Sequence, residues 1–225
     1  MMQKNLHDLF FQFLEKQEPY RSLLCLHGCL PDSSFFQRLK LPIIAADGAA
    51  NVLVKEGVEP HLIVGDLDSA TVELQKRIPC LKIPDQETND LQKAMQHLKE
   101  NNLLPTIVLG ANGGYLDHIL CNISLLAKEE KCLLYDPPYM LGFFLSQGIY
   151  RYSFPLMNKI SLMGAPAARV NSVGLKWELK DYSFEWCGNH SCFNRTVLPE
   201  VTLEVKEGHL LLLLYLQSVE DAGRN

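Results

Sequence analysis

The chain has 225 residues, of which 47% are hydrophobic and 21% charged, with a formal net charge of −5. This is the composition of an ordinary globular protein, long enough for one large core or two modest domains. The charge argues against a nucleic-acid-binding surface, which needs clustered lysines and arginines. The longest apolar run, Leu210–Leu216, is too short to cross a bilayer, and charged residues interrupt the N-terminal segment where a signal peptide would need an apolar core. We expect binding to neither nucleic acid nor a membrane.

The seven cysteines suit a reducing compartment, because their number is odd and they are scattered through strand-like segments. Cys187, His190 and Cys192 have the spacing of half a zinc site, but no partner pair with ligand spacing occurs elsewhere. We therefore expect free thiols and a cytoplasmic protein.

The first part of the chain alternates between strand and helix patterns. Residues 1–18 carry apolar side chains at helical spacing, which predicts an amphipathic helix. Apolar runs then predict strands at 22–27, 42–46, 62–65, 81–84, 106–109 and 131–135, and helices at 48–56, near 71–77, after Asp90 and at 117–128. This alternation predicts an α/β domain over residues 1–138, with a parallel, Rossmann-like sheet covered by helices on both faces.

From residue 139 the pattern changes to short alternating segments separated by glycines and polar turns. They lie at 148–154, 159–163, 175–179, 201–205 and 210–216. We expect an antiparallel β-sandwich domain over residues 139–225. Trp177 and Trp186 lie in this domain, where a tryptophan is usually part of the core, whereas an exposed one would stack on a flat ring.

Acidic residues follow three successive predicted strands. Asp47 ends the second strand, Asp66 and Asp68 end the third, and Asp90 lies between the fourth strand and its helix. Each has an ordinary structural explanation, such as a helix cap, a dipole contact or an acidic turn. Because parallel strands end at one edge of a sheet, where ligands bind, the repetition predicts that these carboxylates converge in one pocket. Such a pocket suits Mg²⁺ with a polyphosphate.

A glycine-rich loop, Gly110–Gly114, joins the fifth strand to the next helix. A loop of this kind can wrap phosphates, although its spacing fits neither the P-loop nor the G-x-G-x-x-G pattern.

The order of these motifs resembles the thiamine pyrophosphokinase family. The family pattern runs D-G-G-x-N, P-x-x-I-x-G-D-x-D-S, D-Q-D-x-T-D with a following Lys, G-G-R-x-D, and later G-L-K-W and S-N. Its counterparts here begin at Asp47, Pro60, Asp85, Gly113, Gly174 and Phe193, so that the resemblance covers roughly residues 41–215.

The resemblance implies a Mg²⁺-dependent enzyme that transfers pyrophosphate from ATP to thiamine, giving thiamine diphosphate and AMP. It also implies a homodimer with active sites between the α/β domain of one subunit and the β domain of the other. The matching positions imply that Asp66, Asp68 and Asp90 bind the metal and that Asp47 joins them in catalysis. ATP and the acceptor would be bound by Asn51, Ser69, Gln86, Lys93, Gly114, Asp117, Trp177 and Asn194. Either Asp66 or Asp90 would accept the hydroxyl proton, and the sequence leaves both open.

Four positions depart from the family pattern. Tyr115 replaces an arginine, which removes a bidentate phosphate clamp that a phenol does not reproduce. Phe193 replaces a serine beside Asn194 and would reshape the vitamin pocket, while Ala49 and Asn89 replace a glycine and a threonine.

Three alternatives stay open. A haloacid-dehalogenase-type phosphatase has a D-x-D-x-T motif that resembles residues 66–70, but Ala70 takes the place of its threonine and no helix-rich cap is predicted. A pyrophosphokinase of another alcohol, such as a pterin, would keep the chemistry, although Trp177 favours thiamine. A non-catalytic protein that binds thiamine or a nucleotide would account for Tyr115 and Phe193.

Overall fold

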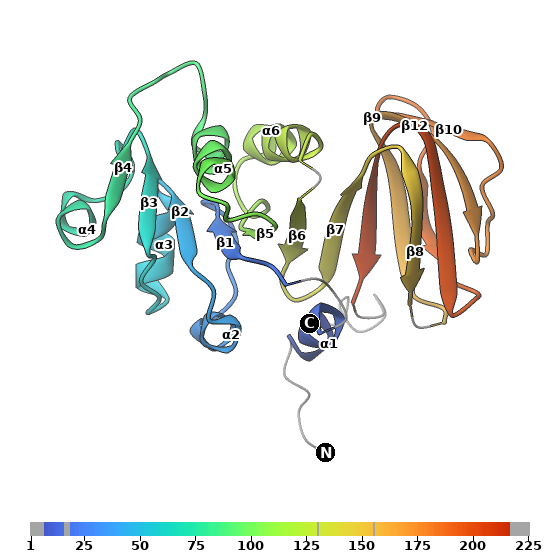
Figure 1. Ribbon diagram of the computed structural model, residues 1–225, viewed down its shortest axis with the longest axis horizontal. Helices are drawn as coiled ribbons and strands as arrows, with labels where there is room; N and C mark the ends of the chain where they lie inside the picture. The colour runs from blue at the N-terminus through green and yellow to red at the C-terminus, as the bar shows by residue number, and fades with distance from the viewer. Residues whose placement is uncertain (1–6, 16–18, 130, 155, 217–225) are drawn as a thin grey trace. The chain divides into compact units, whose positions relative to one another are not determined.

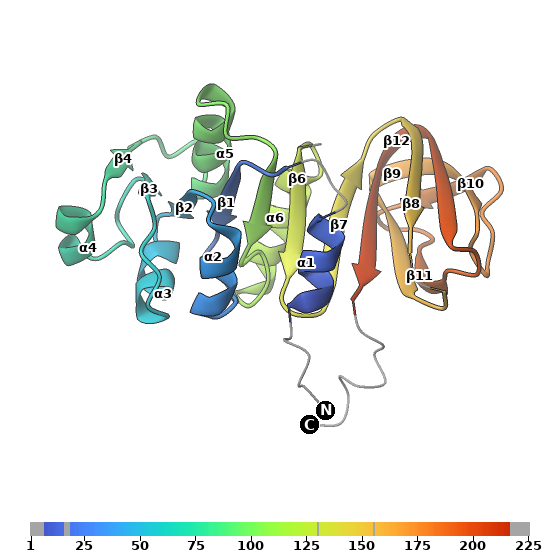
Figure 2. The ribbon, with the colours of Figure 1, turned by 60° about the horizontal axis from the view of Figure 1, so that its bottom comes forward.

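The computed structural model describes residues 7–15, 19–129, 131–154 and 156–216. The chain forms two compact units: Met1–Leu125 with Lys131–Pro138, and Leu126–Glu130 with Tyr139–Asn225. Figures 1 and 2 show parallel strands alternating with helices in the first unit and antiparallel strands in the second. The predicted fold class is confirmed.

The first unit is built on six parallel strands in the order β4-β3-β2-β1-β5-β6. The order reverses at β1, which lies between β2 and β5, and such a reversal is where open α/β sheets bind ligands. The strands are β1 (Ser22–Cys25), β2 (Ile43–Ala46), β3 (Leu62–Gly65), β4 (Cys80–Lys82), β5 (Thr106–Leu109) and β6 (Cys132–Asp136).

Helices lie on both faces of this sheet, with α5 and α6 on one side and α1, α2 and α3 on the other (Figures 1 and 2). Their bounds are α1 (Asp8–Leu14), α2 (Ser33–Leu39), α3 (Ala49–Lys55), α4 (Val72–Arg77), α5 (Asp90–Glu100) and α6 (Leu116–Leu126). Helix α1 corresponds to the helix predicted over 1–18, whose two ends lie outside the described residues.

Helix α2 was not predicted, because the polar cluster Pro31-Asp32-Ser33-Ser34 at its start has the composition of a loop. Asp32 begins it by accepting hydrogen bonds from the backbone N–H groups of Ser34 and Phe35. The helix then buries Phe35 and Phe36, which shows that the polar cluster was an N-terminal cap.

An aromatic cluster fixes α1 to the sheet. The ring of Phe10 stacks on that of Tyr135 with 4.0 Å between centroids. The Nδ1 atom of His7 lies 2.6 Å from the Tyr135 hydroxyl oxygen, and His7 is only 4% exposed. Burial lowers the pKa of His7 and so favours the neutral form of the ring.

The second unit is antiparallel. Its strands are β7 (Met140–Leu145), β8 (Gly148–Ser153), β9 (Lys159–Val173), β10 (Tyr182–Glu185), β11 (Ser191–Arg195) and β12 (Glu200–Tyr215). The first half of β12 pairs with β8, and its second half pairs with β7. Strand β9 lies along both halves of β12 and itself pairs with β11 and β10 at its two ends. The two long strands therefore pair with each other and with all four shorter strands of this unit.

Several strand predictions in this unit were wrong in detail. The segments at 201–205 and 210–216 belong to one strand, which continues through register shifts near Gly208. Residues 175–179 do not form a strand; Leu175 makes an isolated bridge to Thr196. Strands β7, β10 and β11 were not predicted. Strand β7 is buried along almost its whole length and therefore shows no alternation, whereas β10 and β11 are short and each has a single buried residue.

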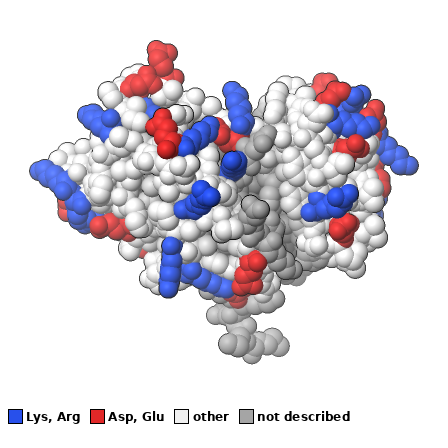
Figure 3. All heavy atoms as spheres, viewed as in Figure 1, with Lys and Arg blue, Asp and Glu red and all other residues white. Residues whose placement is uncertain are grey.

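Among the described residues, no helix is both long and apolar enough to cross a membrane. Basic and acidic side chains are intermixed over the face drawn in Figure 3 rather than gathered by sign.

Candidate functional site

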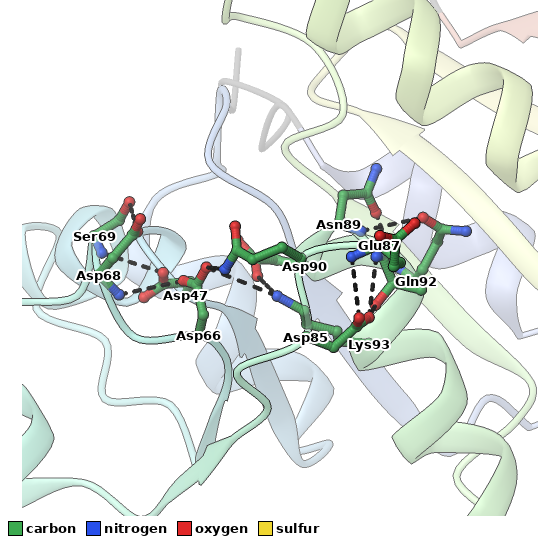
Figure 4. Close-up of polar contacts among 12 residues, drawn as sticks. Asp47, Asp66, Asp68, Ser69, Asp85, Glu87, Asn89, Asp90, Gln92 and Lys93 are labelled. Carbon is green, nitrogen blue, oxygen red and sulfur yellow. Dashed lines mark hydrogen bonds and ion pairs between the residues drawn. The ribbon is translucent and has the colours of Figure 1, made fainter.

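Three carboxylates meet at the end of the parallel sheet. Asp47 follows β2, Asp66 follows β3, and Asp90 is the first residue of α5. One oxygen atom from each lies within 4.8 Å of the others (Figure 4). We call these residues the acidic trio. Asp68, which was expected to join a metal site, is exposed and lies outside this group, whereas Asp47 belongs to it.

The backbone around Asp47 explains its position. Asp47 is fully buried, with a positive φ of 36°, and its two carboxylate oxygens accept hydrogen bonds from Ser69 N (3.2 Å) and Ala70 N (2.8 Å). Gly65 leaves the space that the trio occupies, because a Cβ there would lie 2.7 Å from Asp47 Cβ and 3.0 Å from Asp90 Oδ1. The glycine before Asp66 is therefore required by the packing of the other two carboxylates.

Asp90 is fixed by the start of α5. Asn89 caps this helix: its side chain accepts a hydrogen bond from Gln92 N (2.9 Å), and Gln92 Oε1 accepts one from Asn89 N (3.1 Å). This reciprocal capping box sets the first turn of the helix, and with it the Asp90 side chain. Asn89, which replaces the threonine of the family pattern, thus serves as the N-terminal cap of α5.

The pKa values of the three carboxylates are shifted in different directions. Burial raises the pKa of Asp47 and of Asp90, whereas the hydrogen bond from Gln86 lowers the pKa of Asp66. The buried Lys93 ammonium lies 3.3 Å from Asp90 Oδ1 and 3.9 Å from Asp66 Oδ2. One lysine thus faces two of three neighbouring carboxylates, and a divalent cation would relieve the remaining repulsion. Three carboxylate oxygens at this spacing fit a hard cation.

The other residues expected near the phosphates support the trio. Gln86 Nε2 donates to Asp66 Oδ2 over 2.8 Å. Asn51 holds the loop after Asp68, since its Nδ2 donates to Ser69 O and its Oδ1 accepts from Thr71 N. Ser69 Oγ donates to Asp68 Oδ1 over 2.8 Å, so these two side chains are paired with each other.

A pocket of about 740 Å³ opens beside the trio, at the point where the strand order reverses. Its wall combines the loop after β1, the glycine-rich loop after β5, the start of α5 and the start of α6. Asp90 belongs to both the trio and the pocket wall. The other lining residues are Leu26, His27, Ala46, Asn89, Leu91, Gly110, Ala111, Gly113, Gly114, Tyr115, His118, Ile119, Cys121 and Asn122.

The sequence predicted only some of the residues that line this pocket. Gly114 and Tyr115 line the pocket, whereas Asp117 is exposed on α6, accepts a hydrogen bond from His118 N and is not part of the lining. His27 and His118 were missed. His27 follows an apolar strand and precedes a glycine, as Asp47 does, so this signal could have identified it.

In the second unit, Trp177 is 56% exposed, which is not the core position usual for a tryptophan in a β domain. Asn194 is fully buried behind it, and its amide binds the Trp177 backbone N–H (3.1 Å) and carbonyl (2.8 Å). Phe193 is half exposed and adopts a positive φ of 54° at the irregular register of β11. A bulky residue rarely adopts this conformation.

All seven cysteines are free thiols, with Cys25 and Cys132 buried. Within the described ranges, the acidic trio is the sole cluster of three or more metal-ligating side chains, so Cys187, His190 and Cys192 do not form a second one.

A family model and several known proteins match this chain. The family model "Thiamin pyrophosphokinase, catalytic domain" matches residues 37–135, a range that includes the whole trio. Thiamine pyrophosphokinase 3 of Oryza sativa subsp. japonica is 26% identical, over 67% of this chain and 69% of that protein.

Two crystal structures share the fold. Yeast thiamin pyrophosphokinase superposes with a TM-score of 0.73 at 19% identity, covering 91% of this chain and 89% of that one. Thiamine pyrophosphokinase from Bacillus subtilis gives a TM-score of 0.72 at 20% identity, covering 87% of this chain and 99% of that one. By its catalytic-domain match, its curated relatives and its fold, the chain belongs to the thiamine pyrophosphokinase family.

Proposed function

We propose that the protein transfers a pyrophosphoryl group from ATP to the hydroxyl of thiamine, giving thiamine diphosphate and AMP. One observation carries the proposal: the acidic trio lies beside the switch-point pocket, and Asp90 belongs to both. In such a transfer, charge develops on phosphate oxygens, so positioning and neutralisation supply most of the catalysis.

Mg²⁺ is the cation we propose for the trio, where Asp47, Asp66 and Asp90 would hold it. When bound, it would neutralise the charge that develops on the phosphate oxygens. The protein's own contribution is to orient the ligands. The buried Lys93 forms ion pairs with Asp66 and Asp90, and Gln86 orients Asp66 through a 2.8 Å hydrogen bond. The adjacent loop carries Asp68, which the resemblance places on the metal, and Ser69, which the resemblance places near the phosphates.

Asp90 is the residue we assign as acceptor of the thiamine hydroxyl proton. Of the two candidates, only Asp90 lines the pocket in which a substrate would lie. The Asp66 oxygens already accept hydrogen bonds from Gln86 Nε2 and Asp68 N. We therefore assign Asp66 to the metal and Asp90 to both the metal and proton transfer.

The second unit, residues 139–225, would bind the thiamine ring, while residues 1–138 would bind ATP and Mg²⁺. Trp177 offers an exposed indole for stacking. Asn194 has both amide groups occupied, so its role is to position Trp177 rather than to contact the vitamin. We further propose a homodimer with an active site at the subunit interface, on the strength of the resemblance, and a cytoplasmic location, which the free thiols support.

The test is a reaction of purified protein with ATP, Mg²⁺ and thiamine, analysed by mass spectrometry. Equal amounts of AMP and thiamine diphosphate are expected, and an Asp66→Asn sample prepared in parallel excludes a contaminating enzyme. Formation of ADP or free phosphate would indicate a kinase or a phosphatase instead. Turnover only with a pterin alcohol would change the acceptor, and thiamine binding without turnover would identify a non-catalytic protein.

A further inference from the structure

The pocket beside the trio contains no lysine or arginine among its lining residues, all of which belong to the first unit. Its one carboxylate is Asp90, which is negative when ionised. Lys93, the cation next to the trio, is 5% exposed and already faces Asp66 and Asp90. A nucleotide triphosphate in this pocket therefore needs a source of positive charge besides the metal.

Two imidazoles occupy suitable positions. His27 follows β1, and its Nδ1 lies 3.3 Å from the point where a Cβ on Gly48 would stand, next to Asp47. The His27 ring is thus at the junction of the pocket and the trio. His118, in the first turn of α6, makes an edge contact with Tyr115, with 5.9 Å between ring centroids. In the part of the chain that the structure describes, no hydrogen bond or ion pair occupies the ring nitrogens of either histidine.

Resting on the proposed function, we propose that His27 and His118 are the phosphate-binding cations of this protein, in place of the arginine that Tyr115 replaces. A protonated imidazole donates charge-assisted hydrogen bonds to phosphate oxygens. Unlike arginine, histidine changes its charge between pH 5 and pH 8. Nucleotide binding in this protein therefore depends on pH in a way that an arginine clamp would not.

Other titratable groups face the two rings. Asp90, Tyr115 and Cys121 line the same pocket, and Asp47 lies behind Gly48. Ionisation of the two carboxylates as the pH rises would repel the phosphates but strengthen their hold on Mg²⁺, so pH dependence in the wild-type protein alone would not identify the histidines. Variants of the two histidines are therefore needed to separate their contribution from that of the carboxylates.

The experiment measures binding of the Mg²⁺ complex of α,β-methylene-ATP, a non-transferable analogue, to the full chain by calorimetry at pH 6 and pH 8. We expect the wild-type Kd to rise about tenfold or more over this range, as the imidazoles lose their charge-assisted bonds. The double variant His27→Gln/His118→Gln should bind weakly at pH 6 and lose most of the pH dependence. His97→Gln, on α5 and outside the pocket lining, is the matched control and should behave as wild type.

A gain-of-function variant completes the test. Adding Tyr115→Arg to the double variant should restore binding at both pH values, because a guanidinium stays charged throughout. An unchanged Kd in the double variant, or the same pH dependence in it as in wild type, would overturn the role of the histidines while leaving the proposed function intact. Failure of the wild-type protein to bind the nucleotide at either pH would overturn the proposed function itself, and this inference with it.

Discussion

The Asn194 amide binds both backbone polar groups of Trp177, and its remaining two hydrogen-bonding positions are taken by Ser191 Oγ (3.1 Å) and Arg195 N (2.8 Å). A fully buried side chain thus has every donor and acceptor satisfied, and it holds an aromatic residue that is more than half exposed. This one amide therefore binds both backbone polar groups of Trp177 in its bend.

Asn194→Ala should therefore lower the free energy of unfolding by about 1–3 kcal/mol, because the Trp177 backbone groups lose their partners. Trp177→Ala should change stability less, since the indole is half exposed, but it should raise the KM for thiamine if the ring is a stacking surface. Urea unfolding and steady-state kinetics of both variants check this. Wild-type stability in Asn194→Ala would show that the bend is held by other contacts.

Asp66→Asn should abolish pyrophosphoryl transfer without loss of fold, because it removes one carboxylate of the trio. Asp68→Asn should reduce activity far less, since Asp68 is exposed and lies outside the trio. Activity as a function of Mg²⁺ concentration, with circular dichroism as the check on folding, compares the two. Equal loss in both variants would place Asp68 among the metal ligands, as the sequence pattern alone predicts.

Gly65→Ala should displace the carboxylates of the trio. The new methyl group would lie 2.7 Å from Asp47 Cβ, which forces a shift of the backbone or of the carboxylates. We expect a loss of about 1–3 kcal/mol in unfolding free energy, as for other overpacked sites, and a higher Mg²⁺ requirement. Gly148→Ala is the matched control, because the nearest atom there is at an ordinary 3.4 Å. A fully active, stable Gly65→Ala protein would contradict this account of the glycine.

Stability should fall as the pH drops from 7 toward 5, in part through His7. Burial lowers the pKa of His7 in the folded protein, so the unfolded chain, with a value near 6.5, binds the proton more readily. The stability contributed by the neutral ring is thus present above pH 6.5 and is lost below it. Urea midpoints measured across this range should fall less steeply for His7→Gln than for wild type. Parallel curves would mean that His7 titrates alike in both states.

The sequence predicted the parallel sheet well, because each strand–helix unit has a strong apolar run and a clear stop. It also identified the strand ends that carry Asp47 and Asp66 and the helix start that carries Asp90. It failed at α2, where the Asp32 cap has the same residues as an ordinary turn, and in the second unit, where β12 continues through irregular register around Gly208. A glycine and polar neighbours mark a strand end in one context and a bulge in another.

Within the site, the sequence could not distinguish Asp47 from Asp68 as the third member of the trio. That choice depends on the positive φ at Asp47 and on the loop that turns the exposed Asp68 side chain toward Ser69. Neither has a residue-level signature, since Asp47 adopts a conformation that favours glycine. The two histidines of the pocket lie far apart in the chain, one after β1 and one in the first turn of α6, and only the folded sheet brings them together.

A cation held by the acidic trio would also couple its binding to folding. The three carboxylates come from three separate strand–helix units, so the unfolded chain does not bring them together. By linkage, a cation that binds only the folded form adds RT ln(1 + [cation]/Kd) to the stability of the first unit. In hydrogen-exchange experiments, the amides of β2, β3 and the first turn of α5 should therefore gain protection together when magnesium is added, as one cooperative unit.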